Sequence, residues 1–238
     1  MSSLVKEFTA RLGWHVARGN VIVEGTSDVK IIELAAKLYK ETHEIELLGE
    51  DLSVIAAGLG DEGGVNGINK RYQAIRQIAA AETAFNQRPA HRFIALYDND
   101  RAGREAIGRI TDFDVSISEY SEVFLLHPVM PLKNGTNSQG MKIRFERDNS
   151  NYRNLDWEIE DLISEDLLLA FEAEAPGDVS RKPDIGGLTH RNFTRDGKYK
   201  LLKFIETYAT LKDLSKVIAL IKALRDYCHL QHDHIIIP

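Results

Sequence analysis

Three acidic residues stand directly after short apolar segments, and their types and spacing suit metal-dependent chemistry. Glu24 follows NVIV, and Asp98 and Asp100 follow RFIALY. Side chains two residues apart in extended backbone point to the same side, so Asp98 and Asp100 would lie close together. Such carboxylates repel each other unless a cation or a proton lies between them. Hard oxygen ligands suit Mg²⁺ or Mn²⁺, and Gly25 and Gly103 would let the turns pass close to a metal and a phosphate.

Two other sites that use a DxD motif fit the segment DNDRAG less well. An EF-hand needs a glutamate at the twelfth loop position, but Arg109 stands there and no helix is predicted before the loop. A haloacid-dehalogenase-type phosphatase normally has a Gly-Thr or similar small pair after its nucleophilic aspartate, whereas Arg101 and Ala102 follow here. The acidic residues after the two apolar segments, taken together, therefore favour a metal site.

The first half of the chain alternates strand-like and helix-like patterns. We expect strands at residues 20–24, 51–57, 92–97 and 122–126, and helices at about 29–39, 68–85 and 104–110. This alternation predicts a mostly parallel sheet with right-handed crossovers. In such sheets functional groups gather at the carboxyl ends of the strands, where Glu24 and Asp98 would lie.

The second half of the chain is less regular. Residues 127–154 are rich in turn formers, so we interpret them as a loop or insertion. We expect helical structure at 155–171, a Gly/Pro-rich segment at 176–196, and amphipathic helices at 199–211 and 214–230. The prediction is an α/β catalytic domain at 1–175, with the insertion 127–154, and a helical C-terminal extension at 176–238 packed on or beside it.

The segments NVIVEGTSDVKIIELAAKL and FIALYDNDRAGREAI together resemble the Toprim domain. That domain is shared by topoisomerases, bacterial primases, ribosomal RNA maturases and the OLD-family (overcoming lysogenization defect) nucleases. The resemblance covers residues 18–126 and implies a Rossmann-like α/β fold with an acidic site at Glu24, Asp98 and Asp100. The sequence after Glu24 is closest to the OLD type, in which the next aspartate, here Asp28, is also a metal ligand. The alternative role of Asp28 is to cap the following helix.

The same resemblance implies further site residues in the second half. OLD-like domains carry a later acidic motif, which WEIEDL resembles. One helical face would hold Glu158 or Glu160 but not both, and we prefer Glu160. These domains also tend to use a lysine on the scissile phosphate, and Lys198 and Lys200 are both candidates. Residues 181–203 contain seven basic and two acidic residues in a chain of net charge −6. Such a flank could face phosphate, although lysine-rich helix faces are usually only solvated.

The chain also departs from the complete members of these families. It has no GxxxxGK[ST] phosphate loop, no topoisomerase-sized cleavage domain and no primase zinc-binding part, so we expect a stand-alone Toprim domain. The leading hypothesis is an endonuclease that uses one or two Mg²⁺ or Mn²⁺ ions to cut DNA. The alternatives are a maturase-like RNA-processing nuclease and a non-catalytic partner subunit. The resemblance also implies an ATPase partner in a defence or mobile-element system, and a homo-oligomer stays open.

Composition narrows the setting in which such a protein would act. The chain is 43% hydrophobic and 28% charged, and its net charge argues mildly against a surface designed to coat nucleic acid. Cys228 is the only cysteine, so neither an internal disulfide nor a Cys-based zinc site can form. No signal-peptide pattern or membrane-length apolar run is present, and we expect a cytoplasmic protein away from membranes. His229, His232 and His234 could bind a transition metal, but a frayed terminal tail is the preferred interpretation.

Overall fold

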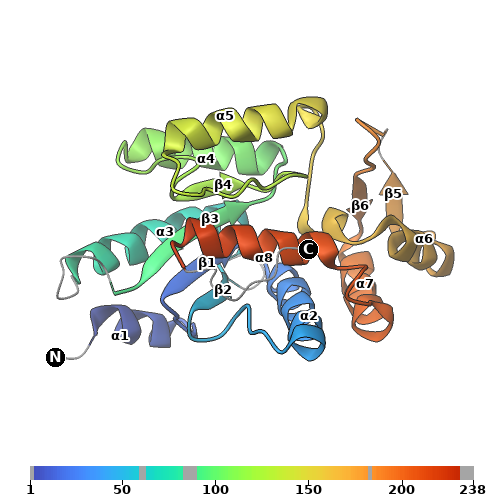
Figure 1. Cartoon of the computed structure of the whole chain (residues 1–238), viewed down its shortest axis with the longest axis horizontal. Helices are drawn as coiled ribbons and strands as arrows, with labels where there is room; N and C mark the ends of the chain where they lie inside the picture. Colours follow the sequence, from blue (N-terminus) through green and yellow to red (C-terminus); the bar gives the residue numbers. More distant parts are fainter. Residues whose placement is uncertain (1–2, 59–62, 83–89, 182–183, 231–238) are drawn as a thin grey trace.

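The computed structural model describes residues 3–58, 63–82, 90–181 and 184–230 (Figure 1). Its centre is a sheet of β1 (Gly19–Val23), β2 (Leu52–Ala56), β3 (Arg92–Tyr97) and β4 (Val123–Leu125). The strand order is β2-β1-β3-β4 and every pair is parallel. A separate antiparallel pair is formed by β5 (Val179–Arg181) and β6 (Arg191–Phe193). The α/β architecture with a parallel sheet, expected from the alternating patterns, is confirmed.

Helices cover both faces of the sheet. On one face α1 (Leu4–Arg11), α3 (Gly64–Ala81) and α4 (Arg101–Phe113) enclose an apolar cluster. On the other face lie α2 (Thr26–His43) and the C-terminal helix α8 (Ser215–Tyr227), which crosses the front of the sheet in Figure 1. All five residues of β1 are buried, as a parallel strand between two helical layers requires.

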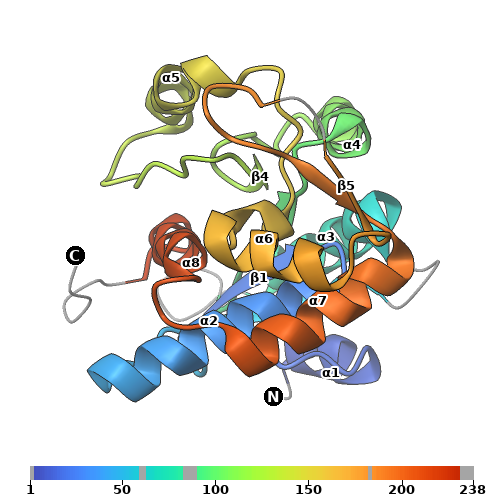
Figure 2. The same cartoon turned by 90° about the vertical axis from the view of Figure 1, so that its right-hand side faces the viewer.

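The C-terminal helices contribute to the layer that covers the sheet. Helix α7 (Arg195–Tyr208) and helix α8 both contact α2, and α6 (Glu165–Glu174) contacts α7. Figure 2 shows α2, α7 and α8 lying together on one side of the molecule. Val217 and Ile221 of α8 belong to the same apolar cluster as Val21 of β1, so this end of the chain helps to bury the strand that precedes Glu24.

Two expectations about the second half were wrong. The expected loop at 127–154 contains α5 (Ser138–Asp148) and a short 3-10 helix, η2 (Ser150–Tyr152). Asn137 caps α5 by accepting a hydrogen bond from the backbone N–H of Gly140, and only Met141 and Phe145 of α5 are buried. Two apolar residues are too weak a pattern to reveal a helix among turn formers.

The expected helix at 155–171 is instead divided in two. The 3-10 helix η3 (Ile159–Leu162) comes first, and α6 begins at Glu165 after Ser164 caps it by accepting from the Leu167 N–H. Other helices differ from expectation mainly at their ends: α2 begins at Thr26, α3 at Gly64, α4 at Arg101 and α7 at Arg195. Residues 83–85 of the expected second helix lie outside the described residues.

Candidate functional site

The strand order places the two acidic motifs side by side. The chain leaves β1 through α2 to reach β2, then crosses the opposite face through α3 to reach β3 on the other side of β1. Right-handed crossovers that turn in opposite directions open a crevice at the carboxyl ends of the two central strands. Glu24 follows β1 and Asp98 follows β3, and the Asp98 N–H donates to Glu24 Oε1 at 3.2 Å. The topology thus joins side chains that are distant in the sequence.

The turn after β3 depends on a glycine. Asp100 caps α4, since its Oδ1 accepts from the Gly103 N–H at 2.7 Å. A Cβ atom at Gly103 would lie 2.0 Å from the carbonyl oxygen of Asp98, so a side chain there cannot be accommodated without moving the backbone. Gly25 differs, because a Cβ there would meet its nearest atom, Ser27 Oγ, at 3.5 Å. Gly103 is therefore required by close packing against the Asp98 carbonyl, whereas Gly25 is not required by packing; the close approach to a metal and a phosphate stays a prediction for both.

Asn99, which sequence reasoning did not select, links the turn after β3 to the later acidic segment that contains Glu158 and Glu160. Its N–H donates to the Trp157 carbonyl at 2.9 Å, and the Trp157 N–H donates back to the Asn99 carbonyl at 3.1 Å. Arg104 reinforces the pair by donating to the Asn99 carbonyl and side-chain oxygens, both at 2.9 Å, and to Asp156 Oδ1 at 2.9 Å. These long-range contacts leave no periodic signal in the sequence, but they place the acidic residues after Trp157 beside Asp98.

Glu158 and Glu160 both face the same lysine. Lys198 Nζ lies 2.9 Å from Glu158 Oε2 and 3.0 Å from Glu160 Oε1. Our expectation that only one of the two glutamates could point to the site was wrong. It assumed an α-helix, whereas Glu158 has extended backbone (φ −117°, ψ 169°) at the start of η3. The change from extended to 3-10 backbone lets side chains two positions apart converge.

The two candidate lysines lie in different surroundings. Lys198 belongs to the first turn of α7, and its side chain is 34% exposed beside the two glutamates. Lys200 is 56% exposed and pairs with Asp178 instead. Of the two lysines, the structure therefore places only Lys198 among the carboxylates.

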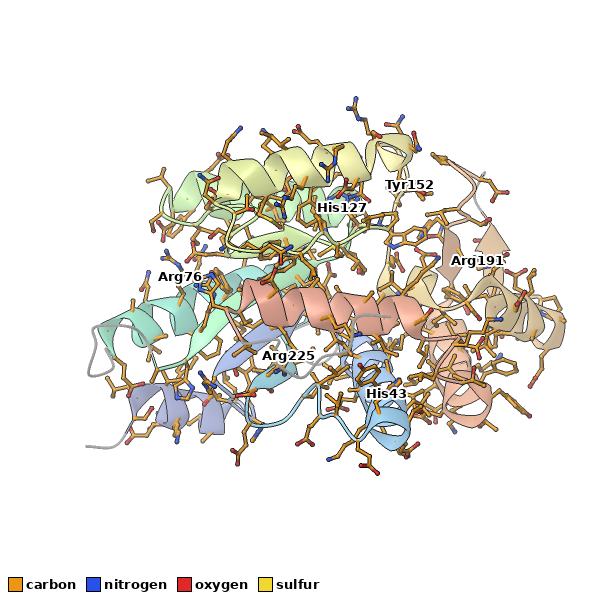
Figure 3. All side chains as sticks on the ribbon, in the orientation of Figure 1. His43, Arg76, His127, Tyr152, Arg191 and Arg225 are labelled. Carbon is orange, nitrogen blue, oxygen red and sulfur yellow. The ribbon has the colours of Figure 1, made fainter. Side chains whose placement is uncertain are left out.

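Asp161 stabilises the turn that contains Glu158 and Glu160, called the acidic turn below. Sequence reasoning did not assign this role to Asp161. Its Oδ2 accepts from the Glu158 N–H at 2.8 Å and lies 2.7 Å from His190 Nδ1. The side chains of Asp161 and His190 are almost completely buried. The neighbouring Arg191, labelled in β6 in Figure 3, pairs with Glu165 and Glu172. This ion-paired network holds the acidic turn against the β5–β6 pair.

Asp28 was expected as a metal ligand or as the N-cap residue, but Gly25 is the N-cap and Asp28 caps α2 from within its first turn. Its Oδ2 accepts from the Gly25 N–H at 2.9 Å at the start of α2, and the residue is buried. Burial raises the pKa of Asp28, the Gly25 hydrogen bond and Lys198 lower it, and the charge of Glu158 raises it. The capping side chain is thus also part of the electrostatic environment of the site.

Burial and mutual repulsion disturb the protonation of the grouped carboxyls. The pKa of Glu24 is raised to about 7, chiefly by burial and further by Asp28 and Asp100. Burial, Asp28 and Glu24 raise the pKa of Asp98 well above its usual range. Burial likewise raises the pKa of Glu160 to about 7, although Lys198 opposes the shift. Burial alone would lower the pKa of Lys198, but Glu160 and Glu158 raise it. One ammonium therefore offsets only part of the negative charge collected here.

The donor chemistry of the group suits a hard divalent cation, but its side chains are not yet arranged around one. Among the described residues, no group of three or more Asp, Glu, His or Cys side chains is placed to hold a metal ion. Both carboxylate oxygens of Glu160 are buried without a hydrogen bond within the described part of the chain, and only Oε1 has the ion pair with Lys198. A buried carboxylate oxygen without a partner is costly and is open to a ligand. The residue types therefore suit Mg²⁺ or Mn²⁺, but their side chains would have to rotate before the carboxylate oxygens could surround one ion.

No family model, curated protein or solved structure matches this chain. The Toprim resemblance, and the activity it implies, therefore stay predictions. Within the described part of the chain, no helix has the length and apolar character needed to cross a bilayer. His229 Nε2 lies 3.1 Å from Lys133 Nζ, whereas His232 and His234 lie outside the described residues.

Proposed function

We propose that this protein is a divalent-metal-dependent phosphodiester hydrolase that cuts DNA. The observation that carries the proposal is the grouping of Glu24, Asp98 and Glu160 beside the carboxyl ends of β1 and β3. Glu160 is buried, Glu24 and Asp98 are half-buried, and the pKa values of all three are raised. Perturbed acidic groups at a topological switch point are typical of a functional site in an α/β protein.

Several carboxylates would act as ligands of Mg²⁺ or Mn²⁺. Glu24, Asp98 and Glu160 are the principal candidate ligands, because each is held by backbone that the fold fixes near the crevice. Asp28 and Asp100 each use one oxygen to cap a helix, and the other oxygen of Asp28 accepts from Ser27 Oγ at 3.3 Å, so both are secondary candidates. Bound as one or two ions, the metal would activate water and stabilise the leaving oxygen of the phosphodiester.

Lys198 supports the hydrolytic part of the proposal. Its ammonium contacts Glu158 and Glu160, so it lies where charge on a bound phosphate would have to be offset. The segment 181–203 is rich in basic residues, but Arg191 is buried between Glu165 and Glu172 and Lys200 pairs with Asp178, so Lys198 is the residue of this segment that supports an anionic substrate. The resemblance to OLD-like Toprim domains points the same way, and an ATPase partner in a defence or mobile-element system remains part of the proposal.

A nicking assay tests the proposal directly. Purified protein is incubated with supercoiled plasmid and Mn²⁺, and EDTA is added to a parallel reaction. We expect nicking that EDTA abolishes and that Asp98→Ala lowers by at least about 100-fold. Asp112→Ala is the matched control, because Asp112 is exposed on α4 away from the acidic group. Absence of metal-dependent nicking, or full activity of Asp98→Ala, would contradict the proposal.

The same assay separates the two nucleic-acid substrates. A structured RNA of similar length is offered in place of the plasmid under the same conditions. Faster cleavage of the plasmid supports DNA as the substrate, whereas faster cleavage of the RNA favours the maturase-like alternative. Native mass spectrometry of the protein isolated from its host would detect an ATPase subunit if one is bound.

A further inference from the structure

A hollow rich in cationic groups lies at the amino ends of the strands, at the opposite edge of the sheet from the grouped carboxylates. It has a volume of about 650 Å³ and is bordered by α3, the start of β3 and the residues just after α8. The ionisable side chains of its lining are three guanidinium groups, two imidazoles and one carboxylate, from Arg18, Arg76, Arg92, His91, His229 and Glu122. With neutral imidazoles the described lining carries a net charge of +2 in a chain whose net charge is −6.

The charge of the three arginines is compensated to different degrees. Arg76 is paired with Glu122 at 3.2 Å and Asp114 at 3.3 Å. Arg18 pairs with Asp51, but the two side chains are 72% and 47% exposed, so solvent screens this contact strongly. Arg92 donates to two backbone carbonyls, of Tyr227 at 3.1 Å and Ser121 at 3.0 Å. Carbonyl oxygens carry only partial charges, so the positive charge of Arg92 is not neutralised by these bonds.

The charge of Arg92 affects the pKa of the neighbouring Lys133. Burial lowers the pKa of Lys133, and the charge of Arg92 lowers it further. His91 is held by a 2.8 Å contact between its Nδ1 and the Ala17 carbonyl, so the Nδ1 carries the proton and the Nε2 is turned away from this bond. The hollow thus combines an oriented imidazole and a guanidinium that has no carboxylate partner among the residues the structure describes.

We infer that this hollow binds the phosphate group of a small ligand of nucleotide size. Guanidinium groups match the oxygens of a phosphate dianion through paired charge-assisted hydrogen bonds. The volume of about 650 Å³ lies within the range typical of small-molecule sites and exceeds what inorganic phosphate alone would fill. The inference does not depend on the proposed nuclease activity, because the hollow lies at the amino ends of the strands and the carboxylates lie at their carboxyl ends.

The test uses AMP, inorganic phosphate and adenosine as probes, with EDTA present so that no metal at the carboxylates can recruit phosphate. Titrations are followed by amide chemical shifts in nuclear magnetic resonance spectra of the full chain. We expect AMP to bind more tightly than phosphate, adenosine not to bind, and AMP to shift the amides of Phe93 and Cys228, which line the hollow. The amides of Gly25 and Asn99 at the other edge should not move.

Substitutions then locate the site. Arg18→Gln and Arg92→Gln each lower AMP affinity by about tenfold, the effect of losing one charge-assisted hydrogen bond. Arg101→Gln, which changes a 90% exposed arginine beside the carboxylates, leaves AMP affinity unchanged, and so does Asp98→Ala. The inference is overturned if AMP does not bind, if adenosine binds as well as AMP, or if both hollow variants bind AMP as the parent does. Because Asp98→Ala removes the proposed catalysis and not this binding, the two proposals can fail separately.

Discussion

The two edges of the central sheet, one at the carboxyl ends and the other at the amino ends of its strands, carry opposite charges. Neighbouring groups stabilise these charges to different degrees. At the carboxyl edge, Lys198 pairs with Glu158 and Glu160, and Glu160 Oε2 is buried without a hydrogen-bond partner among the described residues. At the amino edge, Arg76 donates from all three of its guanidinium nitrogens to Glu122, Asp114 and Ser116. In Figure 3, Arg76 lies at the end of the molecule away from Arg191, which stands near the acidic turn.

This difference separates charges that stabilise the fold from charges that cost stability. A hydrogen-bonded guanidinium contributes to folding, and its removal leaves partners unsatisfied. Grouped, desolvated carboxyls instead oppose folding unless a proton or a cation neutralises them. Natural proteins keep such groups mostly at functional sites, where their cost is offset by what they bind. The contrast predicts that substitutions at the two edges change stability in opposite directions.

The largest expected effect comes from removing one charge at each edge. Asp98→Asn should lower metal-dependent cleavage by at least about 100-fold and raise the metal-free unfolding free energy at pH 8 by about 1–3 kcal/mol. Arg76→Gln should lower the unfolding free energy by about 1–3 kcal/mol, a value discounted because the side chain is 24% exposed. Urea unfolding of both variants in EDTA measures the two changes. A loss of stability in both variants would remove the distinction between the edges.

The second expected effect is that the unfolding free energy of the metal-free protein depends on pH. Glu24 and Glu160 have a pKa of about 7 in the folded state against the ordinary value of 4.5. A carboxyl group whose pKa is higher in the folded state binds its proton more tightly there, so its ionisation disfavours folding. We expect the unfolding free energy to fall by roughly 2–4 kcal/mol between about pH 4.5 and 7.5, superimposed on other titrations.

A variant isolates the part of this pH dependence that belongs to the site. The double substitution of Glu24 and Glu160 by glutamine should flatten the curve over the same pH range. Denaturant unfolding at several pH values, with EDTA throughout, gives both curves. Parallel curves for parent and variant would show that the two carboxyl groups titrate normally.

The smallest predicted change distinguishes the two neighbouring lysines. Lys198→Gln removes the ammonium between Glu158 and Glu160 and should lower the metal-free unfolding free energy at pH 8 by about 1–2 kcal/mol, discounted for its partial exposure. Lys200→Gln is the matched control, because its partner Asp178 lies away from the acidic group and its side chain is exposed. Cleavage should also fall only in Lys198→Gln. Equal effects of the two substitutions would argue against a special position for Lys198.

The parts of the site that follow strands could be predicted from the sequence. A β-branched or apolar run that ends in an acidic residue defines both the strand and the position of the side chain, as at Glu24 and Asp98. The strand bounds of β3 agree with the expected residues 92–97 for the same reason. Gly103 could be identified because the turn before α4 requires close backbone approach.

The parts held by long-range pairing could not be predicted in this way. The Asn99–Trp157 bridge sets the position of Glu158 and Glu160, yet it joins residues far apart in the sequence, and no local pattern indicates such a pairing. The expected helix at 155–171 failed because the local acidic and apolar pattern is compatible with both α and 3-10 backbone. Asp161 and His190 form a buried pair between distant segments, and only the folded chain shows that this aspartate supports the turn and faces away from Lys198.

The central claim is that the carboxylates at the ends of β1 and β3 bind a divalent metal ion. Crystals soaked in Mn²⁺ and measured for anomalous scattering test it without any assumption about substrate. We expect one or two anomalous peaks in contact with Glu24, Asp98 and Glu160, with side-chain rotations that bring these oxygens together, and no such peaks in Asp98→Ala crystals. If the parent crystals show no anomalous density at these residues while Mn²⁺ is visible elsewhere, the carboxylates are not a metal site and the proposed hydrolysis loses its basis.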